Sequence, residues 1–140
     1  MDLEELMRAL RDDGRDHVAD LSAYLEAGGS TDALDPEGWP PIRMAIEFER
    51  DEFIRALAEQ GANLDVTDAA GTPMLLCAFD YEAEGILQGS KLPTEPDFPI
   101  TKVLIELGAN IEGKTSDGRT LWDYARSRGL SERLAEFLEE

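Results

Sequence analysis

The chain has 140 residues, 42% of them hydrophobic, and its 31 Asp and Glu against 13 Lys and Arg give a formal net charge of −18. This length suits one domain, and the apolar share is sufficient for a folded core despite the acidity. A single cysteine excludes an internal disulfide, and no apolar run approaches the roughly 18 residues that a membrane span needs. The first residues, MDLEELMRALRDD, lack the apolar stretch of a signal peptide. Phosphate backbones repel so acidic a surface. We therefore expect a cytoplasmic protein whose partner is a basic protein, with no nucleic acid, membrane or small-molecule substrate involved.

Amphipathic helical spacing recurs in chain order over 3–10, 18–25, 53–58, 100–107 and 130–138. In each segment apolar residues follow the i, i+3, i+4, i+7 pattern of one helix face. The residues that set it are Leu3, Leu6, Met7 and Leu10; Val18, Leu21 and Leu25; Phe53, Ile54, Leu57 and Ala58; Ile100, Val103, Leu104 and Leu107; and Leu130, Leu134, Phe137 and Leu138. Gly28, Gly61 and Gly108 follow three of these segments, and glycine tolerates the left-handed conformation that ends helices.

One eleven-residue frame occurs three times, as GGSTDALDPEG from Gly28, GANLDVTDAAG from Gly61 and GANIEGKTSDG from Gly108. An alanine recurs seven residues past the second glycine of each frame, at Ala45, Ala78 and Ala125. The first two frames start 33 residues apart and the next two 47 apart, which is 33 plus an insertion of 14. Such constant spacing indicates a repeat protein in which each unit is a turn, a short helix, a turn and a longer helix.

The segments GWPPIRMA (38–45), GTPMLLCA (71–78) and GRTLWDYA (118–125) resemble the G-x-T-P-L-H-x-A signature of ankyrin repeats. The histidine of that signature is absent, and the spacing of the signature is matched more closely than its individual residues. The resemblance implies an all-α solenoid of stacked helix-turn-helix units joined by short β-hairpin-like turns. Its units would be an N-terminal cap (1–33), a second unit (34–66), a third with an insertion at about 83–97 (67–113), and a C-terminal cap (114–140).

Residues suited to catalysis or metal binding are few. His17 is the lone histidine, and at its place in the repeat we expect it to make turn hydrogen bonds. Cys77 is expected in the core. Asp35 and Asp68 open turns, where Asp commonly accepts hydrogen bonds from the backbone just after it. We expect a non-enzymatic protein with no catalytic residue, cofactor or metal; an activity that depended on His17 would contradict this.

The resemblance also implies a binding face, because ankyrin-like proteins usually bind partners on the concave side formed by the turn tips and the exposed ends of the first helices. Aromatic anchors flanked by acids would suit a basic partner there. The candidate partner-binding residues are Glu37, Trp39, Glu47, Phe48, Asp80, Tyr81, Leu87, Arg119 and Arg128. An alternative is that the aromatic residues pack under the insertion and extend the core.

The insertion carries Gly85, Gly89, Pro93 and Pro96, which predict a loop and not a longer helix. We expect it beside Asp80 at the edge of the binding face, although a surface loop without a role remains open.

Charge is uneven along the chain. Residues 1–113 hold 25 acids and 8 bases, hence −17, whereas 114–140 hold 6 acids and 5 bases, hence −1. This distribution could steer a basic partner or could simply keep the protein in solution. The function expected from the sequence is a protein-protein interaction module, in its sharper form a stoichiometric inhibitor or toxin-immunity protein. The alternative is an adaptor or scaffold subunit that joins proteins without inhibiting them.

Overall fold

The computed structural model describes residues 1–89 and 97–139, which contain eight α-helices and no β-strand. The expected all-α class is therefore confirmed for these residues. No described helix is both long and apolar enough to cross a membrane. The helices are α1 (Leu3–Leu10), α2 (His17–Glu26), α3 (Pro41–Glu47), α4 (Asp51–Glu59), α5 (Met74–Leu87), α6 (Pro99–Glu106), α7 (Leu121–Ser127) and α8 (Ser131–Leu138).

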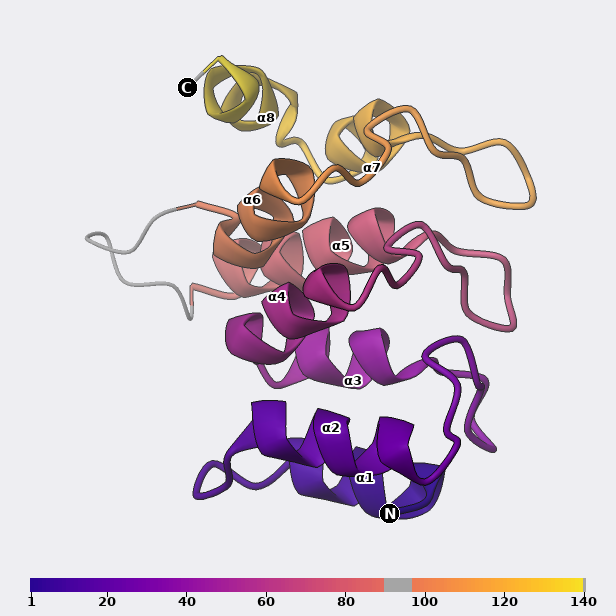
Figure 1. Cartoon of the computed structure of the whole chain (residues 1–140). Helices are drawn as coiled ribbons and strands as arrows, with labels where there is room; N and C mark the ends of the chain where they lie inside the picture. The colour runs from indigo at the N-terminus through magenta and orange to yellow at the C-terminus, as the bar shows by residue number, and fades with distance from the viewer. Residues whose placement is uncertain (90–96, 140) are drawn as a thin grey trace.

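Consecutive helices pack as antiparallel pairs, and each pair stacks on the next (Figure 1). The first helices α1, α3, α5 and α7 contact one another in one row, while α2, α4 and α6 form a second row. The turns between pairs all project on the same side of the stack (Figure 1). The first helices α3, α5 and α7 therefore each follow one of these turns, so that a row of helices lies beside a row of turns.

Local sequence sets the ends of the helices. The carboxylate of Asp2 accepts a hydrogen bond from the Glu5 backbone N–H (2.9 Å) and begins α1 with a capping box. Gly28, Gly61 and Gly108 follow the ends of α2, α4 and α6 with φ angles of 89°, 76° and 99°. These left-handed angles confirm the predicted role of the three glycines as helix stops.

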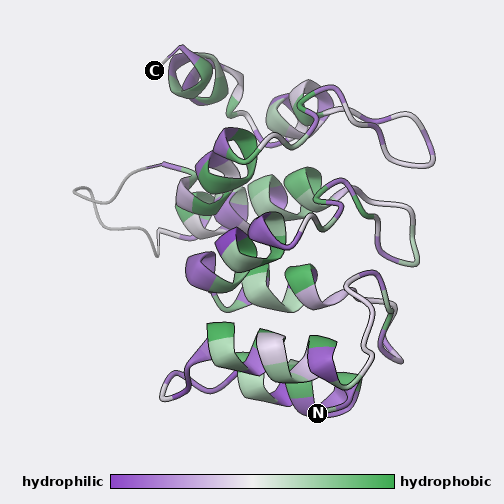
Figure 2. Ribbon diagram, in the orientation of Figure 1, coloured by the Kyte–Doolittle hydropathy of each residue, from purple (hydrophilic) through white to green (hydrophobic). Residues whose placement is uncertain are grey.

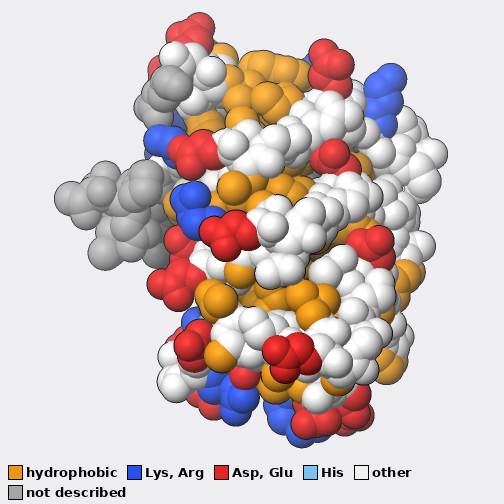
Figure 3. All heavy atoms as spheres, viewed as in Figure 1, with side chains coloured by type: hydrophobic (Ala, Val, Ile, Leu, Met, Phe, Trp, Pro, Cys, Tyr) orange, Lys and Arg blue, Asp and Glu red, His pale blue; other side chains and the backbone are white. Residues whose placement is uncertain are grey.

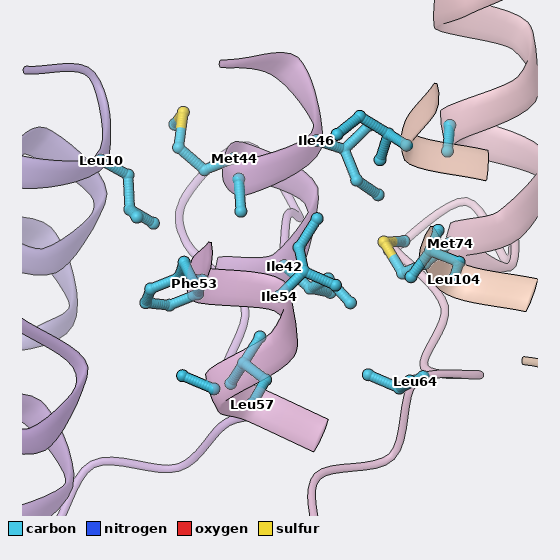
Figure 4. Packing of buried hydrophobic residues seen from close by; sticks show 14 of the residues in the cluster. Leu10, Ile42, Met44, Ile46, Phe53, Ile54, Leu57, Leu64, Met74 and Leu104 are labelled. Atoms are coloured by element: carbon cyan, nitrogen blue, oxygen red, sulfur yellow. The ribbon is translucent and has the colours of Figure 1, made fainter. Parts of the chain in front are cut away.

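The core lies between neighbouring helix pairs. In Figure 4, Phe53 points toward Leu10 on α1, while Ile54 points toward Met74 on α5. A second cluster at the C-terminal end is built on aromatic contacts, with ring centroids 4.9 Å apart for Phe79 and Phe98. Figure 2 shows that hydrophobic and hydrophilic faces alternate along the helices, as the amphipathic spacing requires. Each pair therefore buries its apolar faces against its neighbours.

The turns are hairpin-like, with one isolated antiparallel bridge between Thr67 and Pro73. Neighbouring turns also contact each other, because the Ala69 N–H donates to the Gly38 carbonyl (2.9 Å). A Cβ at Gly38 would lie 2.5 Å from the Ala69 Cβ, and its φ of +83° is left-handed. Glycine is needed at residue 38 both for its backbone angle and for this close approach.

The insertion departs from the sequence-based expectation. Helix α5 continues through Gly85 to Leu87, so 83–87 is helical and the loop prediction is wrong there. Burial explains the extension, because Ala83 is fully buried and Glu82 bonds the start of α6. Gly89 ends this helix, with φ +73°. Pro93 and Pro96 lie outside the described residues.

The predicted apolar face of α2 also needs correction. Val18 is 41% exposed, and the buried residues of this helix are His17, Asp20, Leu21 and Tyr24. Polar side chains occupy this face because they have local partners: the Asp20 carboxylate, for example, accepts from Arg15 (2.6 and 3.0 Å). Leu21 is buried and Leu25 packs against the core as predicted, whereas Val18 is outside the buried face.

Candidate protein-binding groove

A pocket of about 400 Å³ crosses three successive first helices, α3, α5 and α7, and reaches the turn before α5. The residues that line it are Arg43, Glu47, Asp68, Thr72, Leu76, Cys77, Asp80, Tyr81, Glu84, Tyr124 and Arg128. Four carboxylates face two guanidinium groups, so the lining carries a net charge of −2 if all six groups are ionised. We call this pocket the groove.

Four of the nine predicted partner-binding residues line the groove: Glu47, Asp80, Tyr81 and Arg128. The other five lie outside its lining. Glu37 is exposed on a turn, and Leu87 is 52% exposed at the end of α5. Phe48, Trp39 and Arg119 lie outside the lining but contact Arg50, Arg43 and Tyr124.

The predicted aromatic anchors differ in exposure. Phe48 is 40% and Tyr81 is 37% exposed, so neither is part of the core. Trp39 is half-buried and packs against the core, so it extends the core as the alternative expected, but no contact with the insertion is seen among the described residues. Its ring lies 4.3 Å from the Arg43 guanidinium, and that of Tyr124 lies 4.3 Å from the Arg119 guanidinium. These contacts are cation–π interactions within the chain.

Arg128 joins α7 to α5 at one end of the groove. Its Nη2 lies 2.8 Å from the Asp80 carboxylate, and its Nη1 donates to Glu84. Hydrogen bonds from Arg128 and Gln88 hold the pKa of Glu84 below its ordinary value. Asp80 and Arg128, both predicted to meet a partner, are therefore already paired with each other.

Arg43 and Asp68 close the opposite end. One Asp68 oxygen accepts from the backbone N–H groups of Ala70 (3.0 Å) and Thr72 (3.1 Å), which confirms its predicted turn role. Its other oxygen pairs with Nη1 of Arg43. Because this carboxylate binds both the turn and a first helix, it fixes the turn against α3.

Glu47 differs from the other acids of the groove. Within residues 1–89 and 97–139, nothing donates a hydrogen bond to its carboxylate and no cation lies within 4.0 Å of it. Burial raises the pKa of Glu47, and the nearby charge of Arg43 lowers it only in part. A half-buried carboxylate without a donor is less stabilised than a paired one, so it is available to an incoming cation.

Cys77 and His17, the residues best suited to nucleophilic or metal chemistry, are in environments that do not favour it. Cys77 borders the groove, but burial raises its pKa to about 12, so the thiol is protonated at neutral pH. His17 lies on α2, where Nε2 is 3.1 Å and 2.9 Å from the carbonyl oxygens of Ala9 and Asp12, the turn bonding that the sequence predicted. In the described part of the chain, no three His, Cys, Asp or Glu residues are grouped to hold a metal ion.

Seven lining residues were not among the nine predicted: Arg43, Asp68, Thr72, Leu76, Cys77, Glu84 and Tyr124. Glu84 could have been found, because it follows Asp80 by four positions and so shares its helix face once α5 is extended beyond Tyr81. Arg43 likewise precedes Glu47 by one helical turn. The pairing of Arg43 with Asp68 joins residues 25 positions apart, which helical periodicity does not reveal.

No protein-family model matches the chain, and no curated protein does so either.

Proposed function

We propose that this chain is an ankyrin-like repeat protein and a non-enzymatic interaction module that binds a basic protein in its groove. The observation that carries the proposal is a pocket of about 400 Å³ that spans three neighbouring units and holds four carboxylates against two guanidinium groups. The repeat spacing and the stacked helix pairs support the ankyrin-like assignment. A cytoplasmic setting belongs to the same proposal.

The net charge of −18 supports a basic partner. Complementary charge raises association rates by roughly 10–10³-fold at low salt, whereas exposed aromatic side chains supply contact area. Phe48 and Tyr81 are exposed next to Glu47 and Asp80, so apolar area and negative charge occur together.

In its sharper form, the proposal is a stoichiometric inhibitor such as the immunity protein of a basic, nuclease-like toxin. Carboxylates on the groove would then take the places of substrate phosphates in the toxin's site. The strong acidity supports this form.

The test is affinity capture from native cells with the intact protein, at low and high salt. The matched bait carries Trp39→Ala, Phe48→Ala and Tyr81→Ala, with helicity checked by circular dichroism. We expect one basic protein that binds the native bait, dissociates with salt and is lost from the variant; its activity is then assayed with and without the chain. Identical captures by both baits would contradict the assigned binding face.

A second candidate function, an adaptor that joins two proteins, is favoured by apolar side chains at the far end of the stack. Trp122 is 41% exposed, although Ile42 and Leu75, at the matching repeat positions, are each 2% exposed. Figure 3 shows hydrophobic side chains open at this end, between α7 and α8. An adaptor should bind its partner without changing the partner's activity, and Trp122→Ala should release a second protein while the first stays bound.

A further inference from the structure

Several aromatic rings in the groove or near it already have an arginine of this chain beside them. Arg43 lies over Trp39, Arg50 lies 5.9 Å from the Phe48 ring, and Arg119 lies over Tyr124. Tyr81 is the exception: over the ranges 1–89 and 97–139, no guanidinium or ammonium group lies over its ring.

The acids of the groove show the same pattern. Asp68 is paired with Arg43, while Asp80 and Glu84 are paired with Arg128. Glu47 has no such pair among the described side chains, and burial raises its pKa. One carboxylate and one aromatic ring of the groove thus lack the cation that their counterparts have.

These two side chains are neighbours in space. Glu47 ends α3 and Tyr81 lies in the middle of α5, two helices that pack together, and both line the groove. Burial raises the pKa of the Tyr81 hydroxyl, and the negative charges of Glu49 and Glu47 raise it further, as expected for groups close together.

We propose that the groove between Glu47 and Tyr81 receives an arginine side chain of the partner, with the guanidinium hydrogen-bonded to Glu47 and stacked on the Tyr81 ring. This inference rests on the proposed function and identifies the residue type that the groove selects. Arginine fits better than lysine because its planar guanidinium both stacks on a ring and donates to a carboxylate. A pocket of about 400 Å³ has room for one such side chain.

The test titrates the ¹⁵N-labelled full chain with N-acetyl-arginine amide and follows ¹H–¹⁵N chemical shifts. The matched ligands are N-acetyl-citrulline amide, which is neutral and nearly isosteric, and N-acetyl-lysine amide. We expect saturable shifts centred on groove residues, an affinity for the arginine compound at least tenfold above that for citrulline, and a weaker response to lysine.

Variants test the two contacts separately. Glu47→Gln should weaken binding roughly tenfold and Tyr81→Leu by about two- to fivefold. Glu59→Gln, an exposed acid at the end of α4 away from the groove lining, should leave the affinity unchanged. Both test residues are partly exposed and neither side chain makes a hydrogen bond within the described ranges, so the spectra should keep their native dispersion.

Equal binding of arginine and citrulline, equal binding of arginine and lysine, or unchanged affinity in Glu47→Gln would each overturn the arginine site. Shifts spread over all surface acids would overturn it as well. The capture experiment is independent of these results: loss of the partner from the triple variant without an arginine site leaves the proposed function standing. A filled arginine site with no partner lost from the triple variant contradicts the proposed function instead.

Discussion

Glu49 adopts a backbone conformation that usually favours glycine. It follows the end of α3 with φ +56°, and apart from Phe98 it is the only non-glycine residue with positive φ in the part of the chain that the structure describes. Gly129 occupies the matching place after α7, eleven residues past the second glycine of its frame, with φ +70°. A side chain in the left-handed region costs about 1–2 kcal/mol, so the α3–α4 turn holds strain that the α7–α8 turn avoids.

Glu49→Gly should therefore stabilise the protein. The relief of left-handed strain outweighs the entropy that glycine adds to the unfolded chain, and we expect the free energy of unfolding to rise by about 0.5–1 kcal/mol. Urea denaturation followed by circular dichroism measures the change. Glu49→Gln serves as the control, because it removes the charge and keeps the strained backbone; an equal gain in that variant would assign the effect to charge.

At the scale of helices, Glu82 holds α6 against α5. Its carboxylate accepts hydrogen bonds from the backbone N–H groups of Ile100 (2.8 Å) and Thr101 (2.9 Å) and from the Thr101 hydroxyl (2.7 Å). Helix α6 begins after Phe98, which provides no side-chain cap, so an acid from another helix satisfies its first N–H groups. Burial raises the pKa of Glu82, and these hydrogen bonds lower it only in part.

Removal of this cap should destabilise the fold. Glu82→Ala leaves two N–H groups without their acceptor in a buried setting, and we expect a loss of about 2 kcal/mol in the free energy of unfolding. A sharper test compares how the free energy of unfolding depends on pH in the native protein and in Glu82→Gln.

A carboxyl whose pKa is raised by folding binds its proton more tightly in the folded state than in the unfolded state. Its contribution is thus complete below the ordinary value of 4.5 and is lost as pH rises through the raised value. As pH falls from 7 toward 4.5 the native protein should gain more stability than Glu82→Gln does, as measured by urea denaturation at each pH. Glu59→Gln should follow the native curve, and parallel curves for all three proteins would refute the assignment.

The helices could largely be predicted from the sequence, because their signals are local. Leu6, Phe53 and Leu104 each belong to an apolar pattern with helical spacing, and each is fully buried. The end of α5 could not, because its last turns depend on the contact of Glu82 with a helix 18 residues away. In the groove, the repeat register predicted Tyr81 but not the ion pairs, since these join side chains on different helices.

For the whole molecule, there are many more acidic side chains than basic ones to pair with them. Most described arginines form an ion pair, yet the acids outnumber all bases by 31 to 13. The excess carboxylates repel one another across the stack, and such repulsion destabilises the compact state.

Salt should therefore raise the stability of the free protein. Between 0.01 M and 0.15 M salt the screening length falls from about 30 Å to about 8 Å. We expect a gain on the order of 1 kcal/mol, or about 4 °C in Tm for a chain of this size. Thermal denaturation in sodium chloride measures it, with choline chloride as the control for specific sodium binding. A fall in Tm with salt would mean that the ion pairs dominate the repulsion.

The Glu82 cap also bears on how the protein tolerates changes of chain length. It joins the start of α6 to α5 through side-chain hydrogen bonds, so the placement of α6 does not depend only on the covalent connection. For protein engineering, we therefore expect a reporter or a second domain to be tolerated between α5 and α6, because the hydrogen bonds of Glu82 hold the two helices together there.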